Sequence, residues 1–365
     1  MRRHSPIRRR LRGAVGAPTA ITMIALGVAA PVSAQSTVAA DSFAALVDRE
    51  PVGGAAIAVV VDGELAWSTS LGMADVESGR AVGPDTRFRT GSVSKVFTAL
   101  AVLRLHDAGG IELAADVRAL VPAAAHHPWP ITVRQLAGHL GGIRHYRSAE
   151  EYLNTRRYER LSDALGVFSG DSLVAPPGTR YAYSSYGYNL LGAAIEPATG
   201  LDYAEAVRRL VLEPLGLGSV SAETSTPAGS LAVPYSVRDG ALVPSPPFDP
   251  SDRLPSGGWT ASVADLALAG YALIDPGFLS ARARALVLGS QRTNAGEETG
   301  SSIGVRVGVD EAGRRILHHG GTSVGARAFL LVYPDDGVSV ALLANGPAEF
   351  AEAEVGRIAE AFLAE

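Results

Sequence analysis

The 365-residue sequence contains no cysteine. This absence excludes disulfide bonds, thiolate metal sites, a cysteine nucleophile and lipidation of a cysteine. Only 6% of the residues are aromatic and 19% are charged, whereas 47% are hydrophobic. That share of hydrophobic residues provides a large buried core and excludes an intrinsically disordered chain. The length by itself is compatible with one to three domains.

Lysine is almost absent, because Lys95 stands alone against 31 arginines. An amine can lose its proton in a protein when burial lowers its pKa, whereas a guanidinium cannot. Lys95 follows Ser92 by three residues at the start of a predicted helix over 92–107, so both side chains share one helix face. A serine hydroxyl becomes a good nucleophile only when a base takes its proton. The position of the single lysine therefore indicates a nucleophile and its base.

The first 34 residues have the pattern of a signal peptide. Six arginines and no acid lie within residues 1–12, and an apolar run follows over 17–30. Small residues at Val32 and Ala34 then fit a cleavage site after Ala34. The alternative is an uncleaved anchor, for which the apolar run is short. We therefore expect export to the periplasm or the extracellular space, by a route left open, and no membrane span in the mature chain.

Positive charge is scarce beyond this segment. Residues 1–34 carry six positive charges and no negative one, so their removal changes the formal net charge from −5 to −11. No basic stripe is present, and we expect no nucleic-acid partner. The pairs His126-His127 and His318-His319 lack the carboxylate spacing of a metal site, so we expect no metal and no cofactor.

Strand patterns occur near both ends of the chain. Apolar runs over 55–61 and 64–72 flank Asp62-Gly63, which is a strong hairpin signal. Hairpins imply antiparallel pairing. Two further strand pairs are expected, one of 303–309 with 314–319 and one of 328–333 with 338–343. Helices are expected over 40–50, over 262–273 and from Pro347 onward, and the second of these would begin with a capping box of Ser262 and Asp265.

The middle of the chain has a different sequence pattern, in which helical stretches alternate with loops rich in proline and glycine. We therefore predict an α/β (α+β) fold. Residues 35–110 and 250–365 would form an antiparallel sheet flanked by the N- and C-terminal helices. Residues 111–249 would form a mostly helical second lobe.

Two further motifs are candidates for a site. Tyr181 to Gly192 is dense in aromatic residues, which pack in a core or, beside a lysine, share in proton transfer. His318 to Gly325 lies at a strand end and contains G-x-S-x-G around Ser323. A nucleophile elbow needs a helix after the serine and a later histidine. A strand-like run follows here and no histidine comes after His319, so Ser323 is not expected to be the nucleophile.

Three motifs in this order resemble the serine β-lactamase-like superfamily, which includes class C β-lactamases, D-alanyl-D-alanine peptidases and related esterases. Ser92-x-x-Lys95 matches the first motif, Tyr183-Ser184-Ser185 matches the Tyr-x-Asn position, and His319-Gly320-Gly321 matches the Lys/His-x-Gly strand motif. The segment 139–146 is most similar to the branch of mitochondrial serine β-lactamase-like proteins. The resemblance covers about residues 40–363 and implies a β-lactamase/transpeptidase-like fold with a cleft between its lobes.

The resemblance also implies a role for each motif. Ser92 would be acylated by a carbonyl substrate, while Lys95 and Tyr183 would move the proton. His319 would be the strand-motif residue, with His318 as the alternative register. The backbone N–H groups of Ser92 and Thr322 would form the oxyanion hole. Ser185 and Gly321 are the expected substrate contacts.

Two departures from the family pattern bear on the substrate. Ser185 replaces the usual asparagine, which removes an amide contact, and a histidine replaces the lysine of the typical β-lactamase third motif. A neutral imidazole holds a β-lactam carboxylate less well than an ammonium does.

Three functions therefore stay open. The first is an exported serine hydrolase acting on an ester, an amide or a D-amino-acid peptide, with a small molecule or a peptidoglycan-like peptide as its partner. The second is a penicillin-recognising carboxypeptidase or β-lactamase. The third is a non-catalytic or self-assembling module, and no feature of the sequence itself supports self-assembly.

Overall fold

The structure is a computed structural model that describes residues 34–223 and 229–364. The chain from Ala34 onward forms one compact unit. The predicted signal peptide lies outside the described residues except for Ala34, which is the first residue of helix α1 (Ala34–Val47). Within the described ranges, no helix is both long and apolar enough to cross a membrane.

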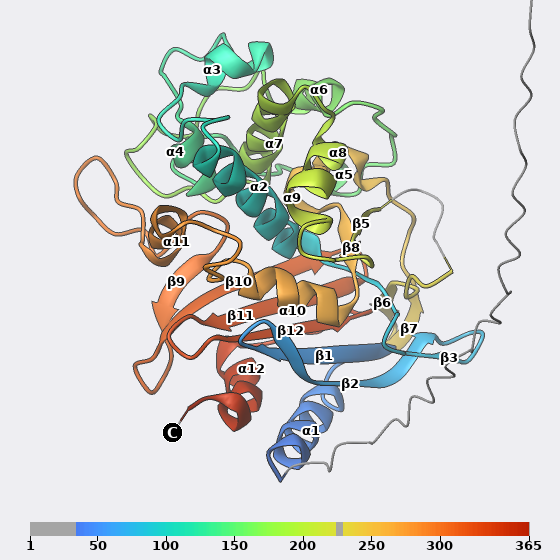
Figure 1. Ribbon diagram of the computed structural model, residues 1–365. Coiled ribbons are helices and arrows are strands. Elements are labelled where there is room, and N and C mark those ends of the chain that lie inside the picture. Colours follow the sequence, from blue (N-terminus) through green and yellow to red (C-terminus); the bar gives the residue numbers. More distant parts are fainter. Residues whose placement is uncertain (1–33, 224–228, 365) are drawn as a thin grey trace, which may run out of the picture. The chain divides into compact units, whose positions relative to one another are not determined.

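The centre of the fold is a seven-stranded sheet in which every pair of neighbours is antiparallel (Figure 1). Strands from the two ends of the chain meet in its middle, where Ile57 pairs with Leu342. This arrangement confirms the predicted fold class. The strand order is β3 (Arg80–Ala81), β2 (Glu64–Asp75), β1 (Gly54–Val61), β12 (Val338–Ala344), β11 (Ala326–Tyr333), β10 (Arg315–Ser323) and β9 (Arg306–Val309).

The hairpin between β1 and β2 turns at the predicted residues. Asp62 has φ +50° and Gly63 has φ +85°. A two-residue hairpin turn with positive φ at both positions matches the right-handed twist of its strands. This is why Asp-Gly between two apolar runs located the turn from sequence alone.

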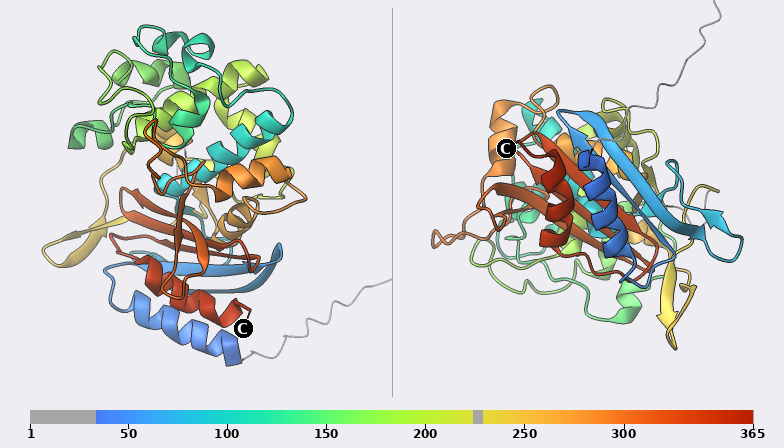
Figure 2. Two further views of the ribbon diagram at one scale, coloured as in Figure 1. Left: turned by 90° about the vertical axis from the view of Figure 1, so that its left-hand side faces the viewer. Right: turned by 90° about the horizontal axis from the view of Figure 1, so that it is seen from below.

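Both faces of the sheet are covered by helices, and this gives three layers (Figure 2). Along β1, Ala55, Ile57 and Val59 pack with α1 and with the C-terminal helix α12 (Glu352–Ala359). The alternate residues Ala56, Ala58 and Val60 face the opposite core. Side chains of a strand point to opposite faces in turn, so a fully apolar strand such as β1 fits a sheet buried on both sides.

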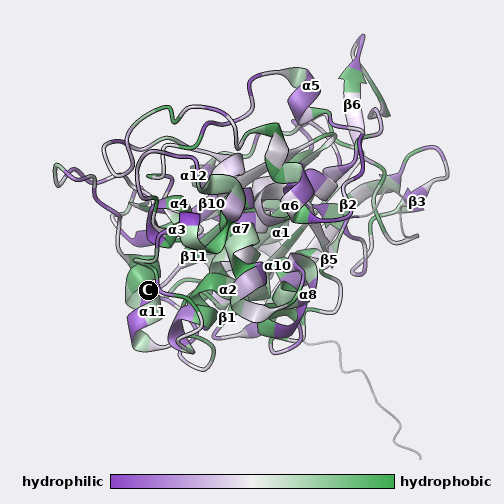
Figure 3. Ribbon diagram, turned by 90° about the horizontal axis from the view of Figure 1, so that it is seen from above, coloured by the Kyte–Doolittle hydropathy of each residue, from purple (hydrophilic) through white to green (hydrophobic). Residues whose placement is uncertain are grey.

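A group of helices lies over the second face of the sheet (Figure 1). Helix α2 (Lys95–Asp107) runs between these helices and the sheet and is buried almost all round, as a central helix must be. Figure 3 looks down on these helices, and the ribbon of α2 is coloured mainly as hydrophobic. The other helices of this side are α3 (Val117–Leu120), α4 (Val133–Ala137), α5 (Ala149–Tyr152), α6 (Leu161–Ala164), α7 (Ser185–Thr199), α8 (Tyr203–Val207), α9 (Leu254–Gly257), α10 (Val263–Tyr271) and α11 (Ala281–Leu288).

Several local predictions differ from the structure. The last helix begins at Glu352 and not at Pro347, and the first begins at Ala34 and not at residue 40. Ser262 caps α10, but the Asp265 carboxylate accepts hydrogen bonds from Ser219 and does not close a capping box. The Asp265 carboxylate therefore bonds to the distant Ser219 and not to the backbone N–H of Ser262.

Two small sheets were not predicted. The first contains β4 (Phe88–Arg89), β8 (Trp259–Ala261) and β5 (Ser221–Ala222), and the second is a hairpin of β6 (Tyr235–Arg238) and β7 (Ala241–Pro244). Strands of two to four residues are too short to show a period in the sequence.

Candidate active site

Ser92 lies in a single 3-10 turn, η1 (Gly91–Ser94), directly before α2. Gly91 has φ +49°, and a Cβ atom there would lie 2.7 Å from the carbonyl oxygen of Thr322. Only glycine combines this backbone conformation with so close an approach to a neighbouring strand. The serine is therefore held against β10 by a backbone contact that no side chain interrupts.

Lys95 is fully buried beneath the serine. Its Nζ lies 3.2 Å from Ser92 Oγ, 3.2 Å from Ser185 Oγ and 2.8 Å from the carbonyl oxygen of Ser256. Burial lowers the pKa of Lys95, and the nearby Tyr183 opposes this only in part. Removal from water disfavours the charged amine, so this lysine is suited to accept a proton.

Tyr183 approaches the same hydroxyl from the start of α7, where Ser184 is the N-cap residue. Its Oη lies 2.9 Å from Ser92 Oγ. Burial raises the pKa of Tyr183, but the charge of Lys95 and hydrogen bonds with Lys95, Ser92 and Ser185 outweigh it, so the net shift is downward. The pKa values of the phenol and the amine therefore move toward each other, which eases proton transfer between them.

The third predicted motif lies on β10 across from the serine. Strand β9 pairs with β10 only as far as His318, so the stretch from His319 to Ser323 has no β9 partner on that edge. This stretch faces η1, and a Cβ on Gly321 would lie 2.2 Å from the carbonyl oxygen of Thr90. The backbones of β10 and η1 are therefore in direct contact. An oxyanion hole that takes one N–H group from each of them requires such a contact.

The two adjacent histidines point to opposite faces of the sheet. His319 is buried and its ring centre lies 6.3 Å from that of Tyr183. His318 packs with Phe329 on the other face, and its Nε2 lies 3.4 Å from a carboxylate oxygen of Glu352. Strand alternation thus brings only His319 to the serine side.

The His319 ring is held in one tautomer. Its Nδ1 lies 2.7 Å from the carbonyl oxygen of Gly320, which can only accept, so Nδ1 carries the proton and Nε2 is left as an acceptor. Burial, together with the charge of Lys95, lowers the pKa of His319 to about 3. The imidazole is therefore neutral at physiological pH.

Residues 321–325, which match the sequence pattern G-x-S-x-G, form part of the hairpin between β10 and β11. Ser323 is the last residue of β10, and Gly325, with φ +66°, lies in the turn to β11. A strand follows where an elbow would need a helix.

Two further histidines beside Tyr183 were not predicted as site residues. The ring centre of His139 lies 4.5 Å and that of His145 5.3 Å from the Tyr183 ring. Each Nδ1 accepts a backbone N–H at 3.2 Å, from Ser184 for His139 and from Ser185 for His145. His139 also has a positive φ of +61°, which is uncommon for a side-chain-bearing residue. The similarity of 139–146 to the mitochondrial branch was the signal for this pair.

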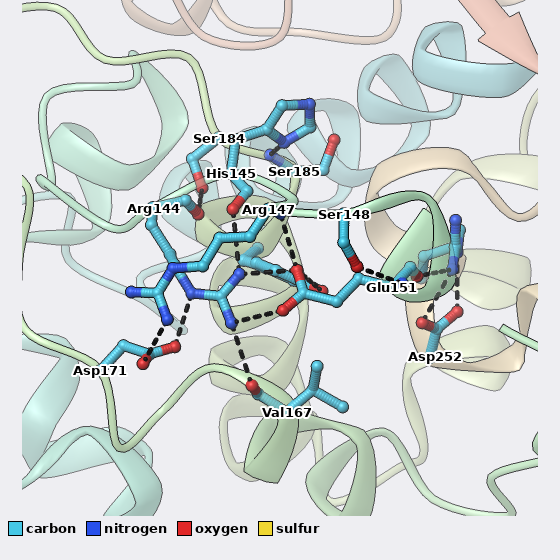
Figure 4. A network of polar contacts seen from close by, with 12 residues as sticks. Arg144, His145, Arg147, Ser148, Glu151, Val167, Asp171, Ser184, Ser185 and Asp252 are labelled. Atoms are coloured by element: carbon cyan, nitrogen blue, oxygen red, sulfur yellow. Dashed lines mark hydrogen bonds and ion pairs between the residues drawn. The ribbon is translucent and has the colours of Figure 1, made fainter. Parts of the chain in front are cut away.

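A network of charged side chains holds the segment that carries His145 (Figure 4). The buried Arg144 guanidinium donates to both carboxylate oxygens of Glu151, at 2.8 and 3.0 Å, and to Asp171 at 2.5 Å. The carbonyl of Arg144 in turn accepts from Ser184 Oγ at 2.6 Å. The network therefore fixes the N-terminus of α7, from which Tyr183 and Ser185 reach the lysine.

Two cavities lie at the site, and Ser92 lines one of them. The serine cavity, of about 330 Å³, is lined among others by Ser92, Tyr183, Ser185 and Thr322. The histidine cavity, of about 530 Å³, is lined among others by Tyr183, His319, Gly321 and Thr322, and not by Ser92. Tyr183 and Thr322 are common to both cavities, so a substrate bonded to Ser92 can extend to either side. Six of the seven predicted site residues thus line these two cavities, and the seventh, Lys95, is buried beneath Ser92.

This fold and this cluster of serine, lysine and tyrosine define a serine hydrolase. Residues 39–365 match the Beta-lactamase family, and the chain belongs to that family. It is 32% identical over 332 residues to penicillin-binding protein 4 of Amycolatopsis lactamdurans, covering 84% of each chain. It is also 26% identical over 291 residues to the human mitochondrial serine beta-lactamase-like protein LACTB, covering 60% of this chain and 53% of that protein.

The same fold occurs in a solved structure. The octameric penicillin-binding protein homologue from Pyrococcus abyssi superposes with a TM-score of 0.75 at 25% identity, covering 91% of this chain and 77% of that one. The expected resemblance to the β-lactamase-like superfamily is therefore confirmed.

Proposed function

We propose that this protein is an exported serine hydrolase that forms an acyl-enzyme on Ser92 with an ester, an amide or a D-amino-acid peptide. The observation that carries the proposal is the placement of Lys95 Nζ and Tyr183 Oη within 3.2 Å and 2.9 Å of Ser92 Oγ. An activated serine needs such a base, and burial supplies it by lowering the pKa of the amine.

In the acylation step, Ser92 Oγ attacks the substrate carbonyl while its proton passes to the Lys95 and Tyr183 pair. The negative charge on the carbonyl oxygen is stabilised by the N–H groups of Ser92 and Thr322. The tetrahedral intermediate collapses as the bond to the leaving group breaks. The pair returns the proton to the leaving group, which departs as an alcohol or an amine.

In the deacylation step, water attacks the ester carbon on Ser92. The same pair takes a proton from that water and returns one to Ser92 Oγ as the bond to the serine breaks. The products are a free carboxylic acid and the restored enzyme. Neutral His319 lines the histidine cavity, to which we assign the leaving group.

Labelling with a fluorophosphonate probe, followed by peptide mapping, tests this proposal. We expect one adduct on Ser92 that Lys95→Ala abolishes, because the hydroxyl then lacks its base. An adduct on Ser323 would assign the chemistry to another serine. Full hydrolytic activity of Ser92→Ala would contradict the acyl-enzyme. Absence of any adduct or turnover would favour a non-catalytic or self-assembling module.

One observation favours a penicillin-recognising D-alanyl-D-alanine carboxypeptidase as the second candidate. The histidine cavity is lined by two arginines, Arg306 and Arg327, and by one acid, Glu349. A leaving group with a carboxylate suits such cationic side chains. Incubation with benzylpenicillin and intact mass measurement tests this candidate. A stable penicilloyl adduct on Ser92 would support a peptidase, while rapid loss of the adduct would support a β-lactamase.

Export is a further part of the proposal. Its support is the arrangement of arginines, apolar residues and Ala34 in the first 34 residues. Expression of the full chain followed by N-terminal sequencing of the fraction outside the cytoplasm tests it. We expect Gln35 as the new first residue, whereas an intact N-terminus in the membrane fraction would indicate an anchor.

A further inference from the structure

One wall of the serine cavity consists of aromatic rings packed around a buried arginine. The guanidinium carbon of Arg253 lies 5.0 Å from the ring centre of Tyr146, 5.5 Å from that of Tyr152 and 5.6 Å from that of Phe248. All four residues line the cavity. Aromatic rings on a guanidinium form favourable cation–π contacts, and they cover its faces against solvent. The wall therefore presents mainly aromatic surface to a ligand.

The charge of Arg253 is already compensated. Its Nε and Nη2 donate to the two carboxylate oxygens of Asp252 at 2.7 and 3.0 Å, and both side chains are only 4% exposed. Nη1 donates to the carbonyl of Tyr152 at 2.7 Å and Nη2 also to that of Glu151 at 3.0 Å. A guanidinium has five N–H donors, so few are left for a ligand. Arg253 therefore has no free pair of parallel N–H groups with which to bind a ligand carboxylate.

No other permanent charge lines this cavity within the described part of the chain. Burial, together with the charge of Lys95, lowers the pKa of His145 to about 4, so its ring is neutral at physiological pH. A carboxylate or an ammonium that entered the cavity would lose its hydration without gaining an opposite charge. That loss is costly, whereas an apolar group gains free energy from the same burial.

The two cavities take different parts of a substrate. The acyl part stays bonded to Ser92, and Ser92 lines the serine cavity only. Tyr183, which shares in the proton transfer, lines both cavities, so the leaving group can take the histidine cavity, which Ser92 does not line. The acyl group therefore belongs in the serine cavity, whose volume of about 330 Å³ suits a compact group.

We propose that the serine cavity selects a compact, uncharged acyl group and that Asp252 sets this preference by neutralising Arg253. This inference rests on the proposed acyl-enzyme on Ser92. It identifies the substrate class as esters or amides of small neutral acids, apolar or aromatic, and it excludes free α-amino acyl groups and dicarboxylic half-esters. Asp252 is a specificity-determining residue in this scheme and takes no part in proton transfer.

Three nitrophenyl esters with acyl chains of similar size test the preference. They are the butyrate, the β-alaninate, in which an ammonium replaces the terminal methyl, and the hemisuccinate, which ends in a carboxylate. Each rate is corrected for spontaneous hydrolysis. For the unmodified protein, we expect kcat/KM for the butyrate to exceed both others at least about tenfold, because neither charge meets a partner.

The variant Asp252→Asn tests the role of the ion pair. Removal of the compensating charge leaves Arg253 free to pair with a substrate carboxylate. We expect the butyrate-to-hemisuccinate ratio to fall at least about fivefold, while the β-alaninate gains nothing. The double change Asp252→Asn with Arg253→Gln should restore the original ratio. Asp85→Asn removes one exposed, unpaired carboxylate and is the matched control, with an unchanged ratio expected.

Each outcome bears on the inference. Equal turnover of the charged and neutral esters would overturn it, as would a folded Asp252→Asn with an unchanged ratio. If that variant does not fold, the ester series on the unmodified protein still decides whether charged acyl groups are rejected. Failure of the proposed function would differ from all of these, since no ester would be hydrolysed and Ser92 would not be labelled.

Discussion

At the scale of single residues, the proposed mechanism depends most directly on Lys95. The chain uses arginine at every other cationic position, and the one lysine is buried beside Ser92. Arginine would keep the positive charge there but could not accept a proton. An exchange of Lys95 for arginine therefore distinguishes two roles of this side chain. A general base would lose its function, whereas an electrostatic anchor would keep it.

We expect Lys95→Arg to lower kcat/KM by about 10²- to 10⁴-fold, as for the loss of a general base. Lys95→Ala should lose a similar factor. Steady-state kinetics with a nitrophenyl ester measures both, and circular dichroism verifies the fold. Arg282→Lys exchanges the same two residue types at an exposed helix position and should be neutral. A Lys95→Arg variant with more than about a tenth of the activity would identify an anchor instead of a base.

At the scale of elements, the site depends on how η1 and β10 approach each other. The edge of β10 beyond His318 has no strand partner in β9, and η1 packs there. Gly91 and Gly321 make this contact because neither has a Cβ atom to hold the backbones apart. The two N–H groups of the proposed oxyanion hole come one from each element, so their spacing is a property of this contact.

We expect Gly91→Ala to lower kcat by about 10²-fold, because the new methyl group moves η1 away from Thr322 and displaces one oxyanion donor. Gly79→Ala is the matched control. Gly79 also has a positive φ, +70°, but no atom lies within 4 Å of its added Cβ. Both variants place a Cβ atom at positive φ, which costs about 1 to 2 kcal/mol. Only Gly91→Ala should lose activity, and equal losses in both would refute a specific contact.

At the scale of the whole molecule, several imidazoles with lowered pKa values link stability to pH. Burial, with help from nearby positive charges, lowers the pKa of His145 and His318 to about 4 and that of His319 to about 3, compared with an ordinary value of 6.5. The unfolded chain therefore binds more protons than the folded chain between these values. The free energy of unfolding should rise with pH through this window.

We expect the free energy of unfolding, measured with urea, to increase from about pH 4 to pH 6.5 and then to level off, since all these rings are neutral in both states above that pH. His318→Gln should reduce the slope, because it removes one of these titrating rings, the one on the sheet face away from Ser92. A slope that is zero or negative between pH 4 and 6.5 would contradict the assignment.

The antiparallel fold class was predictable because its signals are local. A two-residue turn such as Asp62-Gly63 needs positive φ at both positions, and apolar runs on either side determine which residues pair. The division into residues 35–110 with 250–365 and residues 111–249 stays a prediction. The predicted start of the last helix was wrong. Proline is frequent at the first position of helices, which pointed to Pro347, but the chain becomes helical only at Glu352.

The amino-acid sequence by itself determined the candidate nucleophile and base, because a lone lysine three residues after a serine is visible without any coordinates. Only the tertiary structure decided what surrounds them. His139 and His145 reach the site from loops, and Arg253 is placed there by hydrogen bonds to the distant carbonyls of Glu151 and Tyr152. The pairing of two side chains depends on how loops pack in three dimensions, and no periodicity along the chain records that packing.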